Sequence, residues 1–360
     1  MIKNNIILNE DLDAIYKNLN NKIKFKNSTI LITGCDGFIG FYLRNFFLKF
    51  FKILKIKKLI LVDLFPRGVP KNYAKKNINV IIRKLDVTKN TIQLLKIIQD
   101  SDYIIHAASN ASPIMYRKKP ISTIEANIIG LFNIFKMIIN KKKKIRGMLF
   151  FSTSEIYGDP TQSNIPTNET YNGNVATTGP RANYDESKRL GETICWIYGT
   201  KYKIPVVVVR PFNNFGPGMK IHDGRLPSDI ARSIVNNKNI ILYSSGTPTR
   251  TYCYISDAIM GYLQCLLYGK FEIFNIGNDK PELSVKEFCK KFIKISKKTH
   301  NYNKKLVFKK NKDPEYLSFN PNRRCPDLSK AKKILKYKNF IDIDTGISRY
   351  LKFLKQYNEY

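Results

Sequence analysis

The sequence lacks any Cys-x-x-Cys pair, and this absence excludes the usual dithiol and zinc-binding motifs. Its six cysteines are scattered over the chain, at positions 35, 195, 253, 265, 289 and 325. Scattered thiols without a pairing pattern are typical of free, buried cysteines in a reducing compartment. We therefore expect no metal site and no disulfide framework.

Acidic residues are few, with 28 Asp and Glu against 62 Lys and Arg, which gives a formal net charge of +34. Such a charge suits a nucleic-acid or membrane-surface binder. Lysine is, however, spread over the whole length, and no motif of a nucleic-acid-binding module appears. We interpret the charge as a uniform compositional bias that still favours an anionic substrate, and we expect no nucleic-acid partner.

Long hydrophobic runs are also missing. The first 13 residues, MIKNNIILNEDLD, contain no apolar stretch of signal-peptide length. No segment reaches the length of a membrane span, so we expect no membrane partner. Because 43% of the residues are hydrophobic, the chain can bury a sizeable core. The sequence predicts a globular, cytoplasmic protein.

Short apolar runs alternate with helical patterns from residue 29 onward. We predict strands at 29–33, 59–62, 78–82, 103–106, 148–152 and 204–209. Helices are predicted at 38–51, 91–99, 121–140 and 184–198. This alternation is typical of an α/β fold in which helices cover both faces of a doubly wound parallel sheet, the Rossmann arrangement.

The predicted domain organisation has three parts. Residues 1–27 form a polar N-terminal extension with a short amphipathic helix near 8–19, and residues 28–211 form a dinucleotide-binding domain. The segment RPFNNFGPGMKIHDG then carries the Pro, Gly and Asn residues of a loop. Residues 212–360 are predicted to be mainly a smaller substrate-binding lobe, with about 250–275 rejoining the first domain.

A dinucleotide fingerprint follows the first predicted strand in the segment TGCDGFIG. Gly34 permits a tight turn, Gly37 lets a pyrophosphate approach the backbone, and Gly40 lets the helix pack closely on the sheet. The helix start offers free N–H groups and the positive end of its dipole to the phosphates. The spacing differs by one residue from the G-x-G-x-x-G form, and the context predicts a dinucleotide site.

The identity of the dinucleotide depends on residues after the next two strands. Asp63 stands 23 residues after Gly40, where a carboxylate accepts hydrogen bonds from the adenosine ribose and repels a 2′-phosphate. This favours NAD over NADP, although Arg67 nearby keeps NADP open. The pair Asp86 and Val87 could reach the adenine ring; equally, Asp86 could cap a turn.

Tyr184 and Lys188 stand four residues apart in GPRANYDESKR, so a helix places both side chains on one face. Tyrosine ordinarily loses its proton near pH ~10, and a neighbouring ammonium group lowers that pKa. The pair predicts a base that works near neutral pH. An ordinary Tyr and Lys on a surface helix is the alternative, and the upstream fingerprint favours the base.

With these two motifs joined, the chain resembles the extended short-chain dehydrogenase/reductase family, in its NAD-dependent epimerase/dehydratase branch that acts on nucleotide sugars. The resemblance runs from about residue 29 to 335. The segments that carry it are TGCDGFIG, HAASNASP, STSEIYGDP, GPRANYDESKR, RPFNNFGPG, GTPTRTYCYISDA and RRCPDLSKA.

The resemblance implies NAD as cofactor, a nucleotide-diphosphate sugar as substrate, and a homodimer formed through the helices at 121–140 and 184–198. It implies cofactor contacts from the two motifs already described and from four further residues. These are Phe38, Ile39, Ala107 and Ala108.

The family chemistry is a transient oxidation of the sugar at C4. The resemblance implies that Tyr184 removes the proton of the C4 hydroxyl, that Lys188 lowers the tyrosine pKa, and that Thr153 hydrogen-bonds the same hydroxyl. The resulting 4-keto sugar makes the C5 position acidic, or makes a C5 carboxylate easy to lose as carbon dioxide.

The second step depends on Thr153, Ser154 and Glu155. Many 4,6-dehydratases carry Thr-Asp-Glu here, with the Asp as acid and the Glu as base, and Ser154 stands in place of that acid. UDP-glucuronate decarboxylases resemble the observed tripeptide closely, but a GDP-mannose dehydratase group also shows it. UDP-glucuronate decarboxylation is the leading hypothesis for the reaction. A 4,6-dehydratase or a 4-epimerase is the second hypothesis, and a 4-keto reductase is the third. Glu155 is either catalytic or a structural ion-pair partner.

Substrate contacts are implied at positions that in this branch meet the diphosphate or nucleotide, where the planar fork of arginine binds two oxygens at once. These are Asn213, Arg225, Arg250 and Arg324. Arg181 either meets a substrate carboxylate or pairs with acids of its own helix. Asn110, where the decarboxylases commonly have proline, puts the sugar identity in doubt. A nicotinamide-binding regulator without turnover remains the non-enzymatic alternative.

Overall fold

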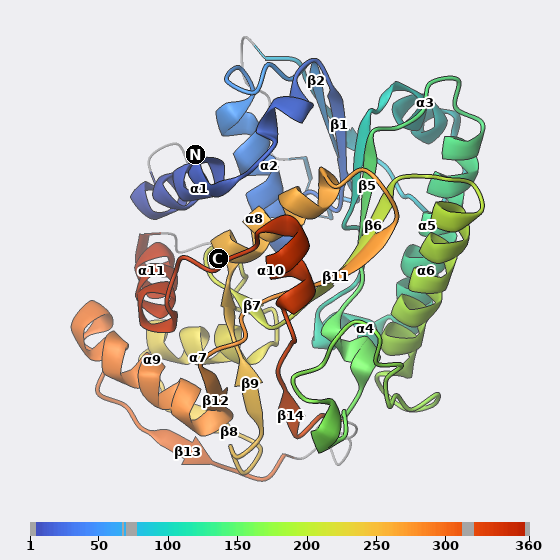
Figure 1. Ribbon diagram of the computed structural model, residues 1–360. Helices are drawn as coiled ribbons and strands as arrows, with labels where there is room; N and C mark the ends of the chain where they lie inside the picture. The colour runs from blue at the N-terminus through green and yellow to red at the C-terminus, as the bar shows by residue number, and fades with distance from the viewer. Residues whose placement is uncertain (1–4, 67, 70–77, 312–319, 357–360) are drawn as a thin grey trace.

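The structure is a computed structural model that describes residues 5–66, 68–69, 78–311 and 320–356 (Figure 1). Its centre is a seven-stranded sheet in the order β11-β6-β5-β4-β1-β2-β3. Every neighbouring pair in this sheet is parallel. The predicted α/β, doubly wound fold is thereby confirmed.

The inner strands of this sheet are buried apolar runs, which is typical of a sheet covered on both faces, whereas the strand at each edge is only partly buried. The strands are β1 (Thr29–Thr33), β2 (Lys58–Asp63), β3 (Val80–Lys84), β4 (Tyr103–His106), β5 (Gly147–Phe151), β6 (Val206–Pro211) and β11 (Glu272–Ile276). The strand order reverses between β1 and β4. In open α/β sheets, ligands bind at the carboxyl ends of the strands beside such a reversal.

Helices cover the two faces of the sheet in two separate layers (Figure 1). One layer holds α3 (Ile92–Asp100), α5 (Pro120–Ile139) and α6 (Ala182–Thr200). The other holds α2 (Phe38–Phe50) and α8 (Ile255–Leu266). Observed and predicted element ends differ by one or two residues in most cases, as fraying helix and strand ends lead one to expect. The short helix α4 (Pro113–Lys118) was not predicted.

A smaller lobe lies below the carboxyl ends of the strands in Figure 1. Its helices are α7 (Leu226–Val235), α9 (Val285–His300) and α11 (Ile343–Gln356), whereas α10 (Ser329–Leu335) packs against α8 and β11 of the main domain. Its strands are β7 (Asn214–Phe215), β8 (Ile240–Leu242), β9 (Thr249–Thr251), β10 (Cys253–Tyr254), β12 (Glu282–Ser284), β13 (Leu306–Phe308) and β14 (Arg323–Arg324). The strands β12, β9 and β14 form a small sheet in the lower part of Figure 1.

The N-terminal extension carries the helix α1 (Ile6–Asn18), which is an integral part of the fold. Asp11 on this helix is 1% exposed and accepts hydrogen bonds of 2.7 Å from the hydroxyls of Tyr42 and Tyr254. Its other oxygen pairs with Arg349 of α11 at 2.8 Å. One carboxylate therefore joins α1 to α2, β10 and α11.

Two further expectations can be compared with the fold. All six cysteines are buried and unpaired, as predicted. The expectation that no segment reaches the length of a membrane span is wrong for α5, a helix of 20 residues with an 18-residue stretch of mean hydropathy 1.3. A core helix of a globular protein meets the same criteria, and 44% of this stretch is buried against the rest of the fold.

Candidate active site

The glycine-rich loop between β1 and α2 packs so tightly that two of its glycines have no room for a side chain. Gly34 has φ +73°, and a Cβ atom there would lie 2.5 Å from the carbonyl of Ala107. A Cβ atom at Gly40 would overlap the carbonyl oxygen of Gly34. At Gly37 the nearest atom would be 3.4 Å away, which is ordinary contact. The surface of the loop at Gly37 is therefore the part left open for a ligand.

The residues around this loop fit a dinucleotide. Phe38 and Ile39 begin α2, so their N–H groups belong to a helix start, the usual anchor for a pyrophosphate. Asp63, at the end of β2, accepts a hydrogen bond of 2.9 Å from the backbone N–H of Asp36 in the loop. Ala108 follows β4 and lies 2.6 Å from the Cβ position of Gly34. These groups would hold the two phosphates and the adenosine ribose of NAD.

After β3, Asp86 has the predicted turn-capping role, and its contact with the adenine ring stays a prediction. Asp86 accepts hydrogen bonds of 2.9 and 2.8 Å from the backbone and side chain of Thr88, so it caps a turn. Val87 is buried and would contact any Cβ atom added at Gly130 of α5. Arg67 lies outside the described residues.

Tyr184 lies buried on α6 with its ring stacked on that of Tyr116 from α4, at a centroid distance of 5.0 Å. The side chain of Thr153, which follows β5, lies close enough to the Tyr184 hydroxyl to affect the tyrosine pKa. Lys188, one turn further along α6, donates a 2.8 Å hydrogen bond to the carbonyl of Phe151. The helix therefore brings the predicted Tyr, Lys and Thr side chains together.

The predicted lowering of the tyrosine pKa is wrong for the protein alone. Burial raises the pKa of Tyr184, and the nearby side chain of Thr153 offsets only part of this rise. The ammonium nitrogen of Lys188 lies 5.8 Å from the centroid of the phenol ring. Burial also lowers the pKa of Lys188 to about 7, which weakens its charge near neutral pH. Sequence spacing shows the shared face but not this loss of hydration.

Glu155 is the centre of a buried cluster of charged side chains. Its carboxylate pairs with Arg181 at the start of α6 and with Arg324 of β14. Burial alone would raise the pKa of Glu155, but these two guanidinium groups hold it at about 2. Arg181 also lies 3.6 Å from Asp185. Burial and the nearby Glu155 raise the pKa of Asp185 to about 7.

Arg250 completes the cluster from the neighbouring strand. It stands opposite Arg324 in the parallel register of β9 and β14. Its described hydrogen bonds go to backbone carbonyls, including those of Thr249 at 2.7 Å and Asn322 at 3.2 Å. Burial and the charge of Arg324 lower the pKa of Arg250 to about 10. Asn213 lies beside this strand and donates to the carbonyl of residue 251 at 2.8 Å.

Arg225 lies apart from the other predicted substrate residues. Its side chain pairs with Asp223, with one hydrogen bond of 2.9 Å. The guanidinium carbon is 5.8 Å from the ring centroid of Phe38, at the start of α2. It also interacts electrostatically with Tyr184. This position is on the cofactor side of the cleft, whereas Arg250 and Arg324 surround Glu155.

Three residues of this region were missed from the sequence. Tyr116 reaches the site only because α4 packs beside α6, and no local pattern marks it. Asp185 could have been found from its spacing of four residues after Arg181, which pairs opposite charges on one helix face. Asp223 could have been suspected as the partner of Arg225 two residues later.

The comparison with known sequences is consistent with this geometry. The profile of the NAD dependent epimerase/dehydratase family matches residues 30–277. UDP-glucuronic acid decarboxylase 6 of Arabidopsis thaliana is 32% identical over 338 residues, covering 91% of this chain and 89% of that protein. UDP-glucuronic acid decarboxylase 1 of Xenopus tropicalis is 31% identical, covering 91% and 72% respectively.

Solved structures share the fold over nearly the whole chain. A UDP-glucose 4-epimerase from Thermotoga maritima, solved with UDP-glucose, has a TM-score of 0.78 and 21% identity, covering 92% of this chain and all of that one. A UDP-glucuronic acid 4-epimerase from Bacillus cereus, solved with UDP-glucuronic acid and NAD, has a TM-score of 0.73 and 24% identity, covering 91% and 99%. At these identities the likeness concerns the fold.

Proposed function

Since this chain belongs to the NAD-dependent epimerase/dehydratase family and NAD is its cofactor, we propose that it decarboxylates UDP-glucuronate through a 4-keto intermediate. The carrying observation is the charge balance around Glu155. Three guanidinium groups, from Arg181, Arg250 and Arg324, share this cluster with two carboxyl groups. One of these carboxyl groups, Asp185, titrates near neutral pH. The positive charges of the cluster therefore exceed its negative charges by at least one.

A sugar carboxylate is the anion that suits this position. Glu155 acts electrostatically on Tyr184, so the cluster lies at the sugar end of the cleft. Arginine binds a carboxylate through paired hydrogen bonds, and in a buried site such charge-assisted bonds gain strength. A neutral hexose would leave this positive charge without a partner. The site is thus better matched to a sugar acid than to glucose.

The chain's residues divide the reaction between them. When bound, NAD supplies the acceptor and later the donor of the hydride at C4. Tyr184, with the side chain of Thr153 near its hydroxyl, removes the proton of the C4 hydroxyl. Lys188, whose pKa burial lowers to about 7, favours this transfer when it is protonated. In the 4-keto sugar the C5–C6 bond breaks, its electron pair moves toward the ketone, and carbon dioxide leaves. C5 then takes a proton before C4 is reduced.

The alternatives differ in what they require of Ser154 and the carboxylate. A 4,6-dehydratase needs an acid to release water, and the hydroxyl of Ser154, 3% exposed, is a poor one. A 4-epimerase acting on the same sugar acid would use the same cationic cluster. It is the second candidate, because the charge balance favours a sugar acid as substrate but is the same for decarboxylation and for epimerisation.

Incubation with a panel of nucleotide sugars, read by mass spectrometry, tests the proposal. Loss of carbon dioxide, about 44 mass units, from UDP-glucuronate is the expected result. Loss of water, about 18 mass units, would identify a dehydratase. An unchanged mass with a new chromatographic peak would identify an epimerase. Net consumption of added reduced cofactor would identify a reductase. Binding of NAD without any turnover of the panel would favour the regulator.

We also propose that the chain is a cytoplasmic homodimer joined through α5 and α6. Both helices expose large apolar side chains on the side away from the sheet. On α5 these are Ile121, Ile124, Ile129, Phe132 and Ile139, and on α6 they are Leu190, Trp196 and Ile197. A group of exposed apolar side chains on two neighbouring helices is typical of a protein interface. Six free thiols support a reducing compartment.

A further inference from the structure

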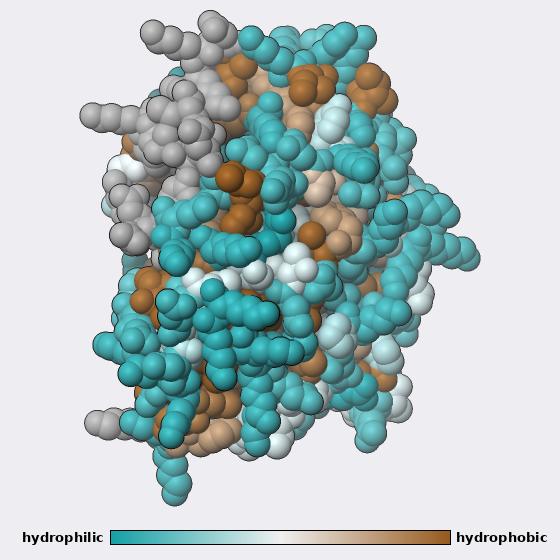
Figure 2. Space-filling view, turned by 90° about the vertical axis from the view of Figure 1, so that its left-hand side faces the viewer, coloured by the Kyte–Doolittle hydropathy of each residue, from teal (hydrophilic) through white to brown (hydrophobic). Residues whose placement is uncertain are grey.

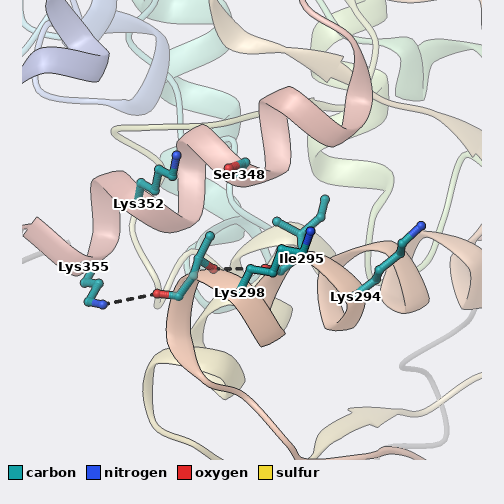
Figure 3. Close-up of a pocket in the computed structure, with 7 residues that line it drawn as sticks. Lys294, Ile295, Lys298, Ser348, Lys352 and Lys355 are labelled. Atoms are coloured by element: carbon teal, nitrogen blue, oxygen red, sulfur yellow. Dashed lines mark hydrogen bonds between the residues drawn. The ribbon is translucent and has the colours of Figure 1, made fainter.

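A cavity of about 600 Å³ lies between α9 and α11, on a side of the molecule that the proposed reaction does not use. It is lined by Lys294, Ile295, Lys298, Thr299, Ser348, Lys352 and Lys355. Figure 3 shows Lys294 and Lys298 rising from α9 and Lys355 reaching from α11 to the end of α9. We propose that this cavity, the α9–α11 groove, binds a small, multiply charged phosphate anion.

The charge balance of the groove is the first reason. Four of its seven lining residues are lysines, and none is acidic. Within the described residues, none of the four has an ion-pair partner. Two acids of α11 and α1 are already paired, since Asp344 binds Lys291 at 2.7 Å and Glu10 binds Arg349 at 2.9 Å. Like charges that share a concave surface concentrate a counter-ion there.

Lysine is abundant everywhere in this chain, so a high local density of lysines would not by itself indicate a binding site. The groove differs because its lysines come from two helices that are about 50 residues apart in sequence and share one cavity. Its volume lies within the usual range for small-molecule sites, about 300–1,000 Å³. The side chains of Thr299 and Ser348 add hydroxyl groups to the lining. Ammonium and hydroxyl groups are the side-chain donors that phosphates accept.

The surroundings favour a free anion over the phosphates of a lipid bilayer. In the part of the chain that the structure describes, neither α9 nor α11 exposes a large apolar side chain that could enter the acyl region. Figure 2 shows this side of the molecule, where hydrophilic side chains cover most of the surface between small apolar patches. A soluble polyphosphate with three or more negative charges matches the size and charge of the groove.

Binding would also relieve repulsion between the two helices. Lys355 already spans the groove, donating 3.3 Å to the carbonyl of Thr299, and it does so beside other ammonium groups. An anion that bridges α9 and α11 binds the folded chain and not the unfolded one. Its binding therefore raises the melting temperature Tm with ligand concentration. This readout does not depend on catalysis.

Thermal unfolding of the full chain with sodium tripolyphosphate as the probe tests the proposal. The measurement is made at constant ionic strength with saturating NAD and UDP, so that the phosphate sites of the nucleotide cleft are filled. We expect Tm to rise by about 2–4 °C at a hundredfold excess over the dissociation constant. A Tm shift that occurs without NAD and UDP but disappears when they are present would place the anion in that cleft and overturn the proposal.

Two matched double variants locate the binding. Lys298→Gln with Lys352→Gln removes one lysine from each wall of the groove and should abolish the shift. Lys290→Gln with Lys297→Gln removes the same charge from exposed positions of α9 outside the lining and should retain it. An equal loss of the Tm shift in both double variants would mean that the overall charge attracts the probe. An unchanged Tm shift in the first double variant would exclude the groove as the binding site. Far-UV circular dichroism checks that all variants fold.

Flotation with phosphatidylcholine vesicles containing phosphatidylserine separates the two sources of phosphate. We expect no flotation at physiological salt. Flotation that requires Lys298 and Lys352, together with no tripolyphosphate shift, would assign the groove to a membrane surface and overturn its assignment to a free anion.

Discussion

Arg250 and Arg324 stand opposite each other on the parallel strands β9 and β14, and both guanidinium groups act on the carboxylate of Glu155. Two like charges are seldom placed in register on adjacent strands, because the pairing is destabilising. The single acid between them also pairs with Arg181. The arrangement is therefore better suited to a bound anion than to the protein alone.

Replacement of Arg250 tests whether this charge recognises the sugar carboxylate. The described hydrogen bonds of Arg250 go to backbone carbonyls. The substitution Arg250→Met therefore breaks no direct hydrogen bond to an acidic side chain. We expect the dissociation constant for UDP-glucuronate to rise about 10–100-fold in Arg250→Met, and the constant for UDP to change much less. Calorimetric titration measures both constants.

Arg250→Lys is the matched control, since it keeps the charge and loses the planar fork. It should recover part of the affinity for UDP-glucuronate. Equal losses for UDP-glucuronate and UDP in Arg250→Met would assign this arginine to the nucleotide diphosphate, as the family resemblance first suggested.

Two glycines of the cofactor loop should respond differently to alanine. At Gly40 a Cβ atom would overlap the carbonyl oxygen of Gly34, so Gly40→Ala should lower both Tm and NAD affinity. At Gly37 the nearest atom is 3.4 Å away, so Gly37→Ala should keep the wild-type Tm. It should nevertheless weaken NAD binding, because the pyrophosphate must approach this residue. Thermal unfolding and NAD titration measure the two effects, and a stable Gly37→Ala variant with unchanged NAD affinity would contradict this placement.

Asp11 should be required for the N-terminal helix to dock. Asp11→Ala leaves the buried hydroxyls of Tyr42 and Tyr254 without their acceptor, which we expect to cost about 2–4 kcal/mol of unfolding free energy. Asp13→Asn is the matched control, because Asp13 pairs with Lys49 at the surface and should contribute little. Urea denaturation compares the variants, and equal stability of Asp11→Ala and wild type would contradict the role of this carboxylate.

The pH dependence of stability gives a second test of Asp11. Burial raises its pKa to about 6, although Arg349 opposes the rise. The folded chain therefore binds more protons at this site than the unfolded chain does between pH ~4 and ~6. The stability gap between wild type and Asp11→Ala should be larger at pH 4.5 than at pH 6.5, by on the order of 1–3 kcal/mol. A gap that grows with pH would show that the ionised form is the stabilising one.

The proposed dimer rests on the apolar face of α5 and α6. Ile129 is 44% exposed and Trp196 is 56% exposed. Replacing both by Glu should give a monomer in multi-angle light scattering, because burying the added carboxylates would be costly. Ile334→Glu on α10, 40% exposed, is the control and should remain a dimer. A monomeric wild-type chain would remove the dimer proposal.

Short-range patterns made much of this fold predictable. The glycine loop and the Tyr184–Lys188 spacing lie within single elements, so the sequence places them before any tertiary packing is known. The register of Arg250 with Arg324 joins strands more than 70 residues apart, and only resemblance to a family brought these positions together. The direction of the Tyr184 pKa depends on burial, which is a property of the packed chain.

The role of the N-terminal extension was unpredictable for the same reason. Asp11 meets partners from α2, β10 and α11, and nothing in residues 1–27 identifies them. The α9–α11 groove is a further example, because its two walls become neighbours only in the folded lobe. The sequence shows lysines in both segments, as elsewhere in the chain, but not the cavity between them.

The most direct test of the central claim is the rate at which Tyr184→Phe converts UDP-glucuronate, compared with Tyr198→Phe on the same helix. Both variants lose one phenol hydroxyl, but only the hydroxyl of Tyr184 lies near Thr153 in the candidate site. We expect Tyr184→Phe to release carbon dioxide at least about 10²-fold more slowly while it still binds NAD. Tyr198→Phe should keep the wild-type rate. Equal rates in Tyr184→Phe and the wild-type chain would contradict the role of this phenol as the base that starts the oxidation.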